Sequence, residues 1–307
     1  MLLFIVSALL LSLSQSYDLS SFYCGFSGDF CGQSVSDDVY SKATIVILAF
    51  ANTSPSGTVV MDEDHFPAEQ VHGWKQAGKK VVISVGGQNG NWAYVFASPE
   101  SRANFISSLS NYVTRFKLDG VDLDIESYLA TPRVVAQTII DLKAELSKKG
   151  KKLLIVSPED VTIYQGTAVP GPDSPGQPFN YFVPIVTLAD QAIDYYQPQA
   201  YNNWYDGFAG GSLEYYEDVY LNWRNLQGLS KWAGPIPNFA GVSGKKLLIG
   251  LLASTSAGGA GYYGQPGTIA AFKTFLESKN YPLKGFMIWD SHWDQLNNNA
   301  ISRVCTE

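Results

Sequence analysis

Three acidic residues alternate with apolar ones near the middle of the chain, at Asp122, Asp124 and Glu126. Alternate side chains of a β-strand share a face, so the three carboxyls point one way and the apolar residues between them point the other. Burying carboxyls side by side is costly unless they share protons and hydrogen bonds, and like charges this close raise the pKa of at least one. A carboxyl that stays protonated near neutral pH suits a general acid. The segment therefore predicts acid catalysis, with Glu126 as the acid at the end of the strand.

Two other interpretations of this segment are weaker. An acidic strand edge exposed to solvent would fit the charges but not the apolar alternation. A site for a hard cation is chemically reasonable, because such ions prefer carboxylate oxygens. However, no second acidic cluster accompanies the segment, and the three histidines are scattered at His65, His72 and His292. We therefore predict neither a metal nor another cofactor.

Eight short apolar or β-branched runs are the candidate strands of the fold. They are Ser21–Gly25, Thr44–Phe50, Lys80–Val85, Gly120–Ile125, Leu153–Ser157, Tyr195–Tyr201, Lys246–Leu252 and Gly285–Trp289. Helical patterns separate most of them, and Ser98 and Thr131, each followed by proline, are helix-start signals. Strands that alternate with helices favour a parallel sheet. Eight such units without a change in composition predict one α/β domain, a (β/α)8 TIM barrel, with a doubly wound sheet as the alternative.

The first residues of the chain indicate its compartment, and its net charge bears on its partners. Residues 1–16 combine an apolar run too short to span a bilayer with small residues near the cleavage position, which is typical of a secretory signal peptide. We expect a secreted, extracellular catalytic domain over 17–307, without a membrane segment in the mature form. The net charge of -7 provides no basic surface for nucleic acid. We expect a monomer.

Cysteines and a glycosylation sequence leave open questions about modification. An oxidising compartment permits one disulfide among Cys24, Cys31 and Cys305, and their spacing does not select the pair. Asn52 begins a formal N-glycosylation sequon. Pro55 follows it and the site lies after a strand end, so we expect it to be unoccupied.

The run Asp119–Glu126 resembles the Asp-Gly-x-Asp-x-Asp-x-Glu signature of glycoside hydrolase family 18, the chitinases and their relatives. Other segments resemble motifs of the same family in the same order along nearly the whole mature chain, namely Ser84–Gly87, Gln199–Asn202 and Gly285–Trp289. The stretch Ser254–Gly267 is too short for the α+β insertion module of one major branch. The chain therefore resembles the compact class III type of plants and fungi. Because the insertion module would form one wall of the substrate groove, its absence from this stretch implies an open groove and endo cleavage.

The resemblance implies a role for each matching residue. Glu126 would protonate the glycosidic oxygen, and the substrate's own acetamido oxygen would attack the anomeric carbon. Asp124 would stabilise the cation that forms, Asp122 would share a proton with Asp124, and Tyr201 would hold the acetamido oxygen. The further residues implied to contact substrate are Tyr23, Phe50, Gly87, Gln199, Asn202 and Trp289, the last lying under the distorted sugar.

Two details of the chain bear on this resemblance. The peptide bonds after Ala49 and Trp289 resemble ones that are often cis in the family. Asp290 stands where serine is commoner.

Aromatic residues that follow strand ends could stack on more distant sugars or simply pack, and these are Trp92, Trp204, Tyr205, Tyr262 and Tyr263.

The implied substrate is chitin or N-acetylglucosamine oligosaccharides. An endo-β-N-acetylglucosaminidase that cuts N-glycan cores would carry the same strand motif, so the motif does not separate these two activities. A third interpretation is an inactive, chitin-binding barrel. Such relatives usually lose an acid of the motif, whereas Asp122, Asp124, Glu126 and Tyr201 are all present here.

Overall fold

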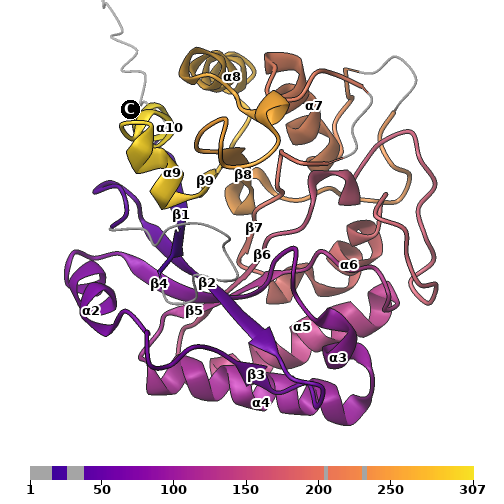
Figure 1. Ribbon diagram of the computed structural model, residues 1–307. Helices are drawn as coiled ribbons and strands as arrows, with labels where there is room; N and C mark the ends of the chain where they lie inside the picture. Colours follow the sequence, from indigo (N-terminus) through magenta and orange to yellow (C-terminus); the bar gives the residue numbers. More distant parts are fainter. Residues whose placement is uncertain (1–15, 26–37, 204–206, 230–233) are drawn as a thin grey trace, which may run out of the picture.

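The computed structural model describes residues 16–25, 38–203, 207–229 and 234–307 (Figure 1). All but the last residue of the predicted signal peptide, together with Cys31, Trp204 and Tyr205, lie outside the described residues. Within those ranges, none of the helices combines the length and apolar character needed to cross a membrane.

Eight parallel strands form a barrel. They are β1 (Asp18–Cys24), β2 (Ile45–Thr53), β4 (Lys80–Gly86), β5 (Gly120–Asp124), β6 (Leu153–Val156), β7 (Tyr195–Tyr196), β8 (Leu248–Leu252) and β9 (Gly285–Trp289). Neighbours pair in the order β7-β6-β5-β4-β2-β1-β9-β8, and two isolated parallel bridges, Tyr196 to Leu247 and Gln199 to Gly250, join the ends of this order. A short strand, β3 (Val59–Val60), pairs antiparallel with β2. The predicted TIM barrel is confirmed, and the doubly wound sheet is wrong.

Helices surround the strands (Figure 1). They are α2 (Ala68–Gln76), α3 (Trp92–Phe96), α4 (Pro99–Arg115), α5 (Pro132–Ser147), α6 (Phe182–Ala189), α7 (Leu213–Trp223), α8 (Pro266–Ser278), α9 (Ser291–Leu296) and α10 (Ala300–Thr306). Both predicted N-caps are present: Ser98 Oγ accepts a hydrogen bond from Ser101 N, and Thr131 Oγ1 accepts one from Val134 N. Between the end of β8 and the start of α8 the chain has only residues 253–265, which leaves no room for an insertion module.

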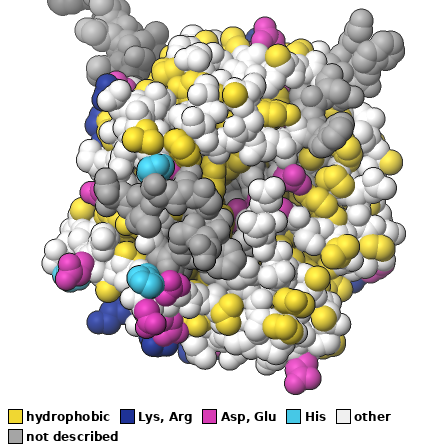
Figure 2. All heavy atoms as spheres, in the orientation of Figure 1, with side chains coloured by type: hydrophobic (Ala, Val, Ile, Leu, Met, Phe, Trp, Pro, Cys, Tyr) yellow, Lys and Arg dark blue, Asp and Glu magenta, His cyan; other side chains and the backbone are white. Residues whose placement is uncertain are grey.

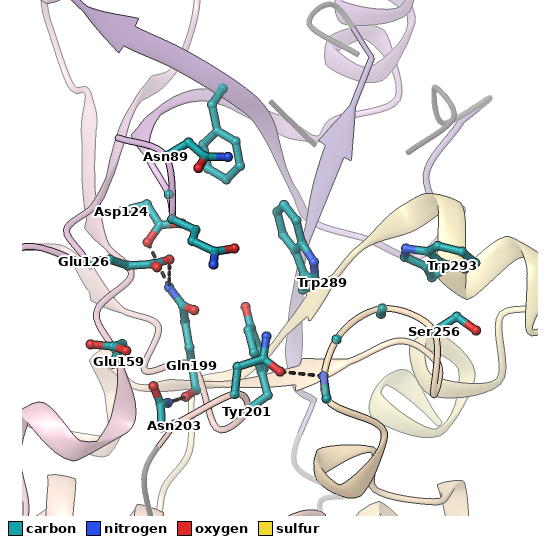
Figure 3. Close-up of a pocket in the computed structure, with 17 residues that line it drawn as sticks. Asn89, Asp124, Glu126, Glu159, Gln199, Tyr201, Asn203, Ser256, Trp289 and Trp293 are labelled. Carbon is teal, nitrogen blue, oxygen red and sulfur yellow. Dashed lines mark hydrogen bonds between the residues drawn. The ribbon is translucent and has the colours of Figure 1, made fainter. Parts of the chain in front are cut away.

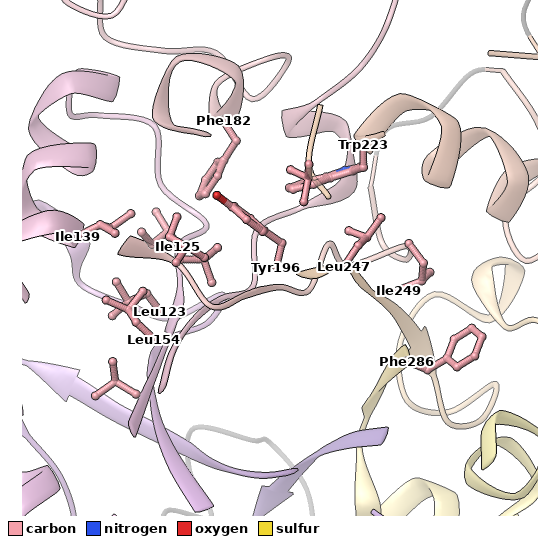
Figure 4. Packing of buried hydrophobic residues seen from close by; sticks show 14 of the residues in the cluster. Leu123, Ile125, Ile139, Leu154, Phe182, Tyr196, Trp223, Leu247, Ile249 and Phe286 are labelled. Carbon is pink, nitrogen blue, oxygen red and sulfur yellow. The ribbon is translucent and has the colours of Figure 1, made fainter. Parts of the chain in front are cut away.

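The two faces of the barrel strands pack into different environments. Leu123 and Ile125 point outward and pack with Ile139 of α5 and Phe182 of α6 (Figure 4). A smaller cluster fills the inside of the barrel and includes Phe22, Ile47, Val82, Ile155 and Met287. Because successive side chains of β5 alternate between these two regions, Asp122 and Asp124 face the interior, as predicted.

The described cysteines differ in state. Cys24 is disulfide-bonded, whereas Cys305 has a free thiol that is fully buried. This removes Cys305 from the candidate pairs. Asn52, the predicted sequon residue, is only 7% exposed, and its Nδ2 donates to the backbone oxygen of Asn89 at 3.4 Å. The nitrogen that would carry a glycan is therefore held against the protein.

Candidate active site

A cavity of about 730 Å³ opens at the carboxyl ends of the barrel strands, the position where TIM-barrel enzymes hold their active sites. Acidic side chains lie in and beside the hollow near the centre of this face (Figure 2). The cavity brings together most of the residues that the sequence analysis singled out. They are Phe50, Gly87, Asp124, Glu126, Gln199, Tyr201, Asn202 and Trp289 (Figure 3).

Asp122 lies deeper in the barrel and does not line the cavity. Its two carboxyl oxygens accept hydrogen bonds from Ser84 Oγ at 2.6 Å and from Ser157 Oγ at 2.7 Å. Burial raises the pKa of Asp122 to about 7, because desolvation disfavours the charged form more than the two hydroxyls favour it. Both oxygens are thus occupied by hydroxyl groups.

Asp124 and Glu126 form a coupled pair at the wall of the cavity. The side-chain nitrogen of Gln199 donates to Asp124 Oδ1 at 2.8 Å, to Glu126 Oε1 at 3.1 Å and to the backbone oxygen of Ser157 at 3.0 Å. Burial and the charge of Glu126 raise the pKa of Asp124. Burial also raises the pKa of Glu126, although the hydrogen bond from Gln199 opposes it.

A hydrogen bond between the two carboxyls raises the pKa of Asp124 and lowers that of Glu126, so the pair retains a proton between them. The sequence analysis expected Asp122 to share this proton. The charge of Asp122 also raises the pKa of Asp124, and each oxygen of Asp122 accepts one hydroxyl hydrogen bond, so proton sharing between Asp122 and Asp124 stays a prediction.

Aromatic rings form the side of the cavity opposite this pair. Trp289 stacks on Phe50, with ring centroids 5.6 Å apart and planes 27° from parallel, and Phe22 meets Trp289 edge-on at 5.2 Å. The peptide bonds Ala49–Phe50 and Trp289–Asp290 are cis, as predicted. Gly87 has φ +73°, and a Cβ there would lie 3.0 Å from the Phe50 ring, so the backbone can approach the ring only because this residue is glycine.

Tyr201 points into the cavity from the segment after β7 (Figure 3). It is 4% exposed, and burial together with the charges of Asp124 and Glu126 raises the pKa of its phenol. The hydroxyl therefore keeps its proton and is a hydrogen-bond donor for a ligand. It donates to the sulfur of Met287 at 3.9 Å, which is a weak acceptor.

Tyr23 is not brought to the cavity, which corrects the expectation that it contacts substrate. Its ring packs edge-on against Trp74 of α2, with centroids 4.8 Å apart, in the layer between strands and helices. Phe22, one residue earlier, points inward instead. The expectation came from matching Tyr23 to an aromatic position of the family, and a match displaced by one residue exchanges the two faces of a strand.

Two further expectations about aromatic residues are resolved. Trp92 is 2% exposed, and its indole nitrogen donates to the backbone oxygen of Asp124 at 2.8 Å, so it supports the acidic strand rather than stacking on sugar. Tyr262 and Tyr263 do not line the cavity. The hydroxyl of Tyr262 donates to the backbone oxygen of Asn203, and that of Tyr263 accepts from Asn297 at 2.9 Å.

The side chains of Asn202 and Asp290 accept hydrogen bonds from backbone nitrogens near the cavity. Asn202 adopts φ +59°, and its Oδ1 accepts a hydrogen bond from Gly259 N at 2.6 Å, which holds the loop after β8 against the cavity. Asp290 is fully buried; its Oδ1 accepts from Trp293 N at 3.2 Å and caps α9, while Oδ2 lies 3.3 Å from the sulfur of Cys24.

Sequence reasoning missed part of the cavity lining. The missed residues are Gln88, Asn89, Glu159, Asn203, Ser256, Ala257, Gly258, Gly259 and Trp293. Most follow strand ends, which is the signal that could have identified them. Within the part of the chain that the structure describes, no group of three or more metal-ligating side chains is arranged to hold an ion.

Comparisons with known proteins agree with this geometry. The chain is 26% identical over 259 residues to chitinase D of Niallia circulans, a match covering 74% of this chain and 48% of that protein, so it spans about half the length of that relative. It is 25% identical over 274 residues to a probable class II chitinase of Arthroderma benhamiae, covering 78% and 79%.

Solved structures share the fold. The crystal structure of a putative chitinase A from Streptomyces coelicolor superposes with a TM-score of 0.70 at 24% identity, covering 94% of this chain and 97% of that one. A family GH18 chitinase from Chromobacterium violaceum gives 0.73 at 22% identity, covering 94% and 82%. The sequence profile of glycosyl hydrolases family 18 matches residues 22–257. The chain therefore belongs to glycosyl hydrolase family 18.

Proposed function

We propose that this protein is a secreted, endo-acting chitinase that hydrolyses β-1,4 bonds between N-acetylglucosamine units with retention of configuration. The observation that supports the proposal most is the pair of carboxyls Asp124 and Glu126, bridged by the Gln199 side chain, which lines the cavity across from Trp289. The pair supplies an acid, and the ring supplies an apolar surface for a sugar. Two relatives whose names contain "chitinase" support the choice of substrate.

The first step uses the proton held by the acidic pair. Glu126 transfers it to the glycosidic oxygen while the bond between that oxygen and the anomeric carbon breaks, and the leaving sugar departs as an alcohol. The carbonyl oxygen of the substrate's acetamido group forms the new bond to the anomeric carbon, which gives a cyclic oxazolinium ion. Tyr201 donates a hydrogen bond that holds this oxygen for attack. Loss of the shared proton leaves Asp124 negatively charged beside the cation, which it stabilises.

The second step consumes water. Glu126, now a carboxylate, accepts a proton from a water molecule, whose oxygen adds to the anomeric carbon as the acetamido oxygen leaves. The water enters from the face that the leaving sugar vacated, so the configuration is retained. Because the acetamido group is the nucleophile, sugars that lack it, as in cellulose or xylan, are not substrates.

A paired turnover assay tests the substrate. Chitotetraose and a high-mannose glycopeptide would be incubated with the purified protein, and their products identified by mass spectrometry. We expect cleavage of chitotetraose and no release of the glycan. Release of the glycan alone would instead assign an endo-β-N-acetylglucosaminidase, and silence on both substrates would assign a binding protein.

The position of cleavage is tested separately. The interval between β8 and α8, residues 253–265, is too short to hold an inserted α+β module beside the cavity, which supports an open groove. We therefore expect a chitin hexamer to be cut at internal bonds from the first turnovers. Release of only monomer or dimer from one end would contradict endo action.

The compartment and the assembly state complete the proposal. The disulfide at Cys24 supports an oxidising compartment, as does the apolar start of the chain. N-terminal sequencing of protein secreted by a host cell should begin at Tyr17, whereas retention inside the cell would contradict secretion. Light scattering should give the mass of one chain.

A further inference from the structure

Glu159 is a carboxyl in the cavity that the proposed mechanism does not use. It follows β6, is partly exposed and lines the cavity. Glu126 and Gln199 lie between Glu159 and Trp289 (Figure 3). A parallel backbone bridge joins Glu159 to Gln199, and Thr162 donates to the backbone oxygen of Glu159 through both its nitrogen and its hydroxyl, so the backbone at this point is well held.

No positive charge accompanies this carboxyl within the described residues. The described lining of the cavity contains no lysine, arginine or histidine, and none of the salt bridges found in those ranges involves Glu159. Lysine and arginine side chains visible on this face lie at its periphery (Figure 2). Burial and the charge of Glu126 raise the pKa of Glu159 to about 7. A cation bound beside Glu159 would relieve both effects, because it replaces lost solvation and offsets the neighbouring charge.

The proposed function predicts which sugar of the substrate lies beside Glu159. If Glu126 protonates the oxygen of the cleaved bond and Trp289 lies under the sugar that keeps the anomeric carbon, the leaving sugar must extend past Glu126 on the opposite side. Glu159 is on that side and next to Glu126 in the barrel, because β5 and β6 are neighbouring strands. The sugar directly after the cleaved bond is therefore the one that meets it.

We propose that Glu159 binds the ammonium group of a glucosamine unit placed directly after the cleaved bond, so that in partially deacetylated chitin the bonds followed by glucosamine are cut preferentially. This inference rests on the proposed function. Removal of the acetyl group from N-acetylglucosamine leaves an amine at the same carbon, and the protonated amine pairs with a carboxylate at short range. The sugar before the cleaved bond must keep its acetyl group, because that group is the nucleophile. The preferred bond thus runs from N-acetylglucosamine to glucosamine.

The experiment sequences the ends that cleavage creates. Chitosan with about half of its units acetylated would be digested at a pH at which its amines are protonated, and the units at the new non-reducing ends would be identified by mass spectrometry. For the unchanged protein we expect glucosamine at these ends to be enriched about three- to tenfold over its share of the polymer, as expected for one partly buried ion pair. Glu159→Gln should remove this enrichment, because the amide keeps the shape without the charge.

A matched control separates a local effect from a change in net charge. Glu145 lies near the end of α5, close to the start of β6 and so at the opposite end of the barrel, and Glu145→Gln removes the same single charge. This variant should keep the full enrichment. Raising the salt concentration should reduce the enrichment in the unchanged protein, because ions screen the pair.

The outcomes distinguish this inference from the proposed function. Cleavage of fully acetylated chitotetraose without enrichment on chitosan would overturn the role of Glu159 and leave the chitinase intact. An enrichment that persists in Glu159→Gln would also overturn it, because another group would then select glucosamine. Failure to cleave either substrate would overturn both proposals together.

Discussion

The side-chain nitrogen of Gln199 lies 3.1 Å from Oε1 of Glu126 and donates a hydrogen bond to it. A donor to a carboxylate favours the charged form, and this contact accordingly lowers the pKa of Glu126 against the effect of burial. Burial has the largest effect on the pKa of Glu126, and Gln199, on the segment that follows β7, partly offsets it.

Gln199→Leu should extend activity to higher pH. Without the amide donor the pKa of Glu126 rises, so the acid keeps its proton to a higher pH and the alkaline limb of the pH–rate profile moves upward. Loss of one hydrogen bond to a charged group corresponds to about one pH unit. The measurement is kcat against pH on chitotetraose. Gln137→Leu, on the exposed face of α5, is the control, and an alkaline limb that stays in place or moves down would contradict the assignment.

Glu126→Gln should remove most turnover while leaving binding. The amide has the shape of the acid but cannot deliver a proton, and loss of a positioned general acid costs about 10²- to 10⁴-fold in rate. Turnover of chitotetraose and its affinity, measured by calorimetry, are the two readouts. Turnover close to that of the unchanged protein would exclude Glu126 as the acid.

Tyr201→Phe should lower kcat more than it changes KM. The phenol keeps its proton because burial and the neighbouring acids raise its pKa, so it donates to the acetamido oxygen and positions it for attack. We expect a loss of about ten- to a hundredfold in kcat, the range of one positioned hydrogen bond in a water-poor site. Tyr112→Phe, on the outside of the barrel, is the control. Unchanged kinetics in Tyr201→Phe would count against the positioning role.

Asp122→Asn should alter how stability depends on pH. The folded state raises the pKa of Asp122 from an ordinary 3.8 to about 7, so folding favours its protonated form. The stabilisation from this group is complete below about pH 4 and is lost as pH rises to about 7, with a total near 4 kcal/mol. Asparagine does not titrate, so the stability of Asp122→Asn has no such pH-dependent loss at this position.

Urea unfolding of both proteins at pH 4 and pH 8 tests this prediction. The free energy of unfolding of the unchanged protein should fall, relative to that of Asp122→Asn, by about 4 kcal/mol across the interval. Parallel curves would mean that Asp122 has the same pKa in the folded and unfolded chains.

Much of the site could be predicted because strand geometry is local. The period of two in Asp122, Asp124 and Glu126 places the carboxyls on one face wherever the strand lies. Their spacing, the motif around Ser84–Gly87 and the start signals at Ser98 and Thr131 depend only on residues close in the chain. All of these features agree with the structure.

The alternation of side chains along a strand does not say which of the two faces points into the barrel. Every residue of β1 after the first is buried, so burial alone does not distinguish the inward from the outward face. The resemblance to the family implies a substrate contact for Tyr23, although Phe22 occupies the inward side. Only the pairing of β1 with β2 and β9 sets the phase, through contacts that no short stretch of sequence contains.

The sequence by itself determined the alternation of acids and apolar residues on β5, the number of strand–helix units and the family. The tertiary structure alone decided how these acids titrate and which partners they have. Gln199 reaches Asp124 and Glu126 from 75 and 73 residues away, Ser84 and Ser157 approach Asp122 from 38 and 35, and Glu159 comes to the cavity from the next strand. A pKa depends on burial and on charges within a few ångströms, and closure of the barrel is what brings these distant residues within that range.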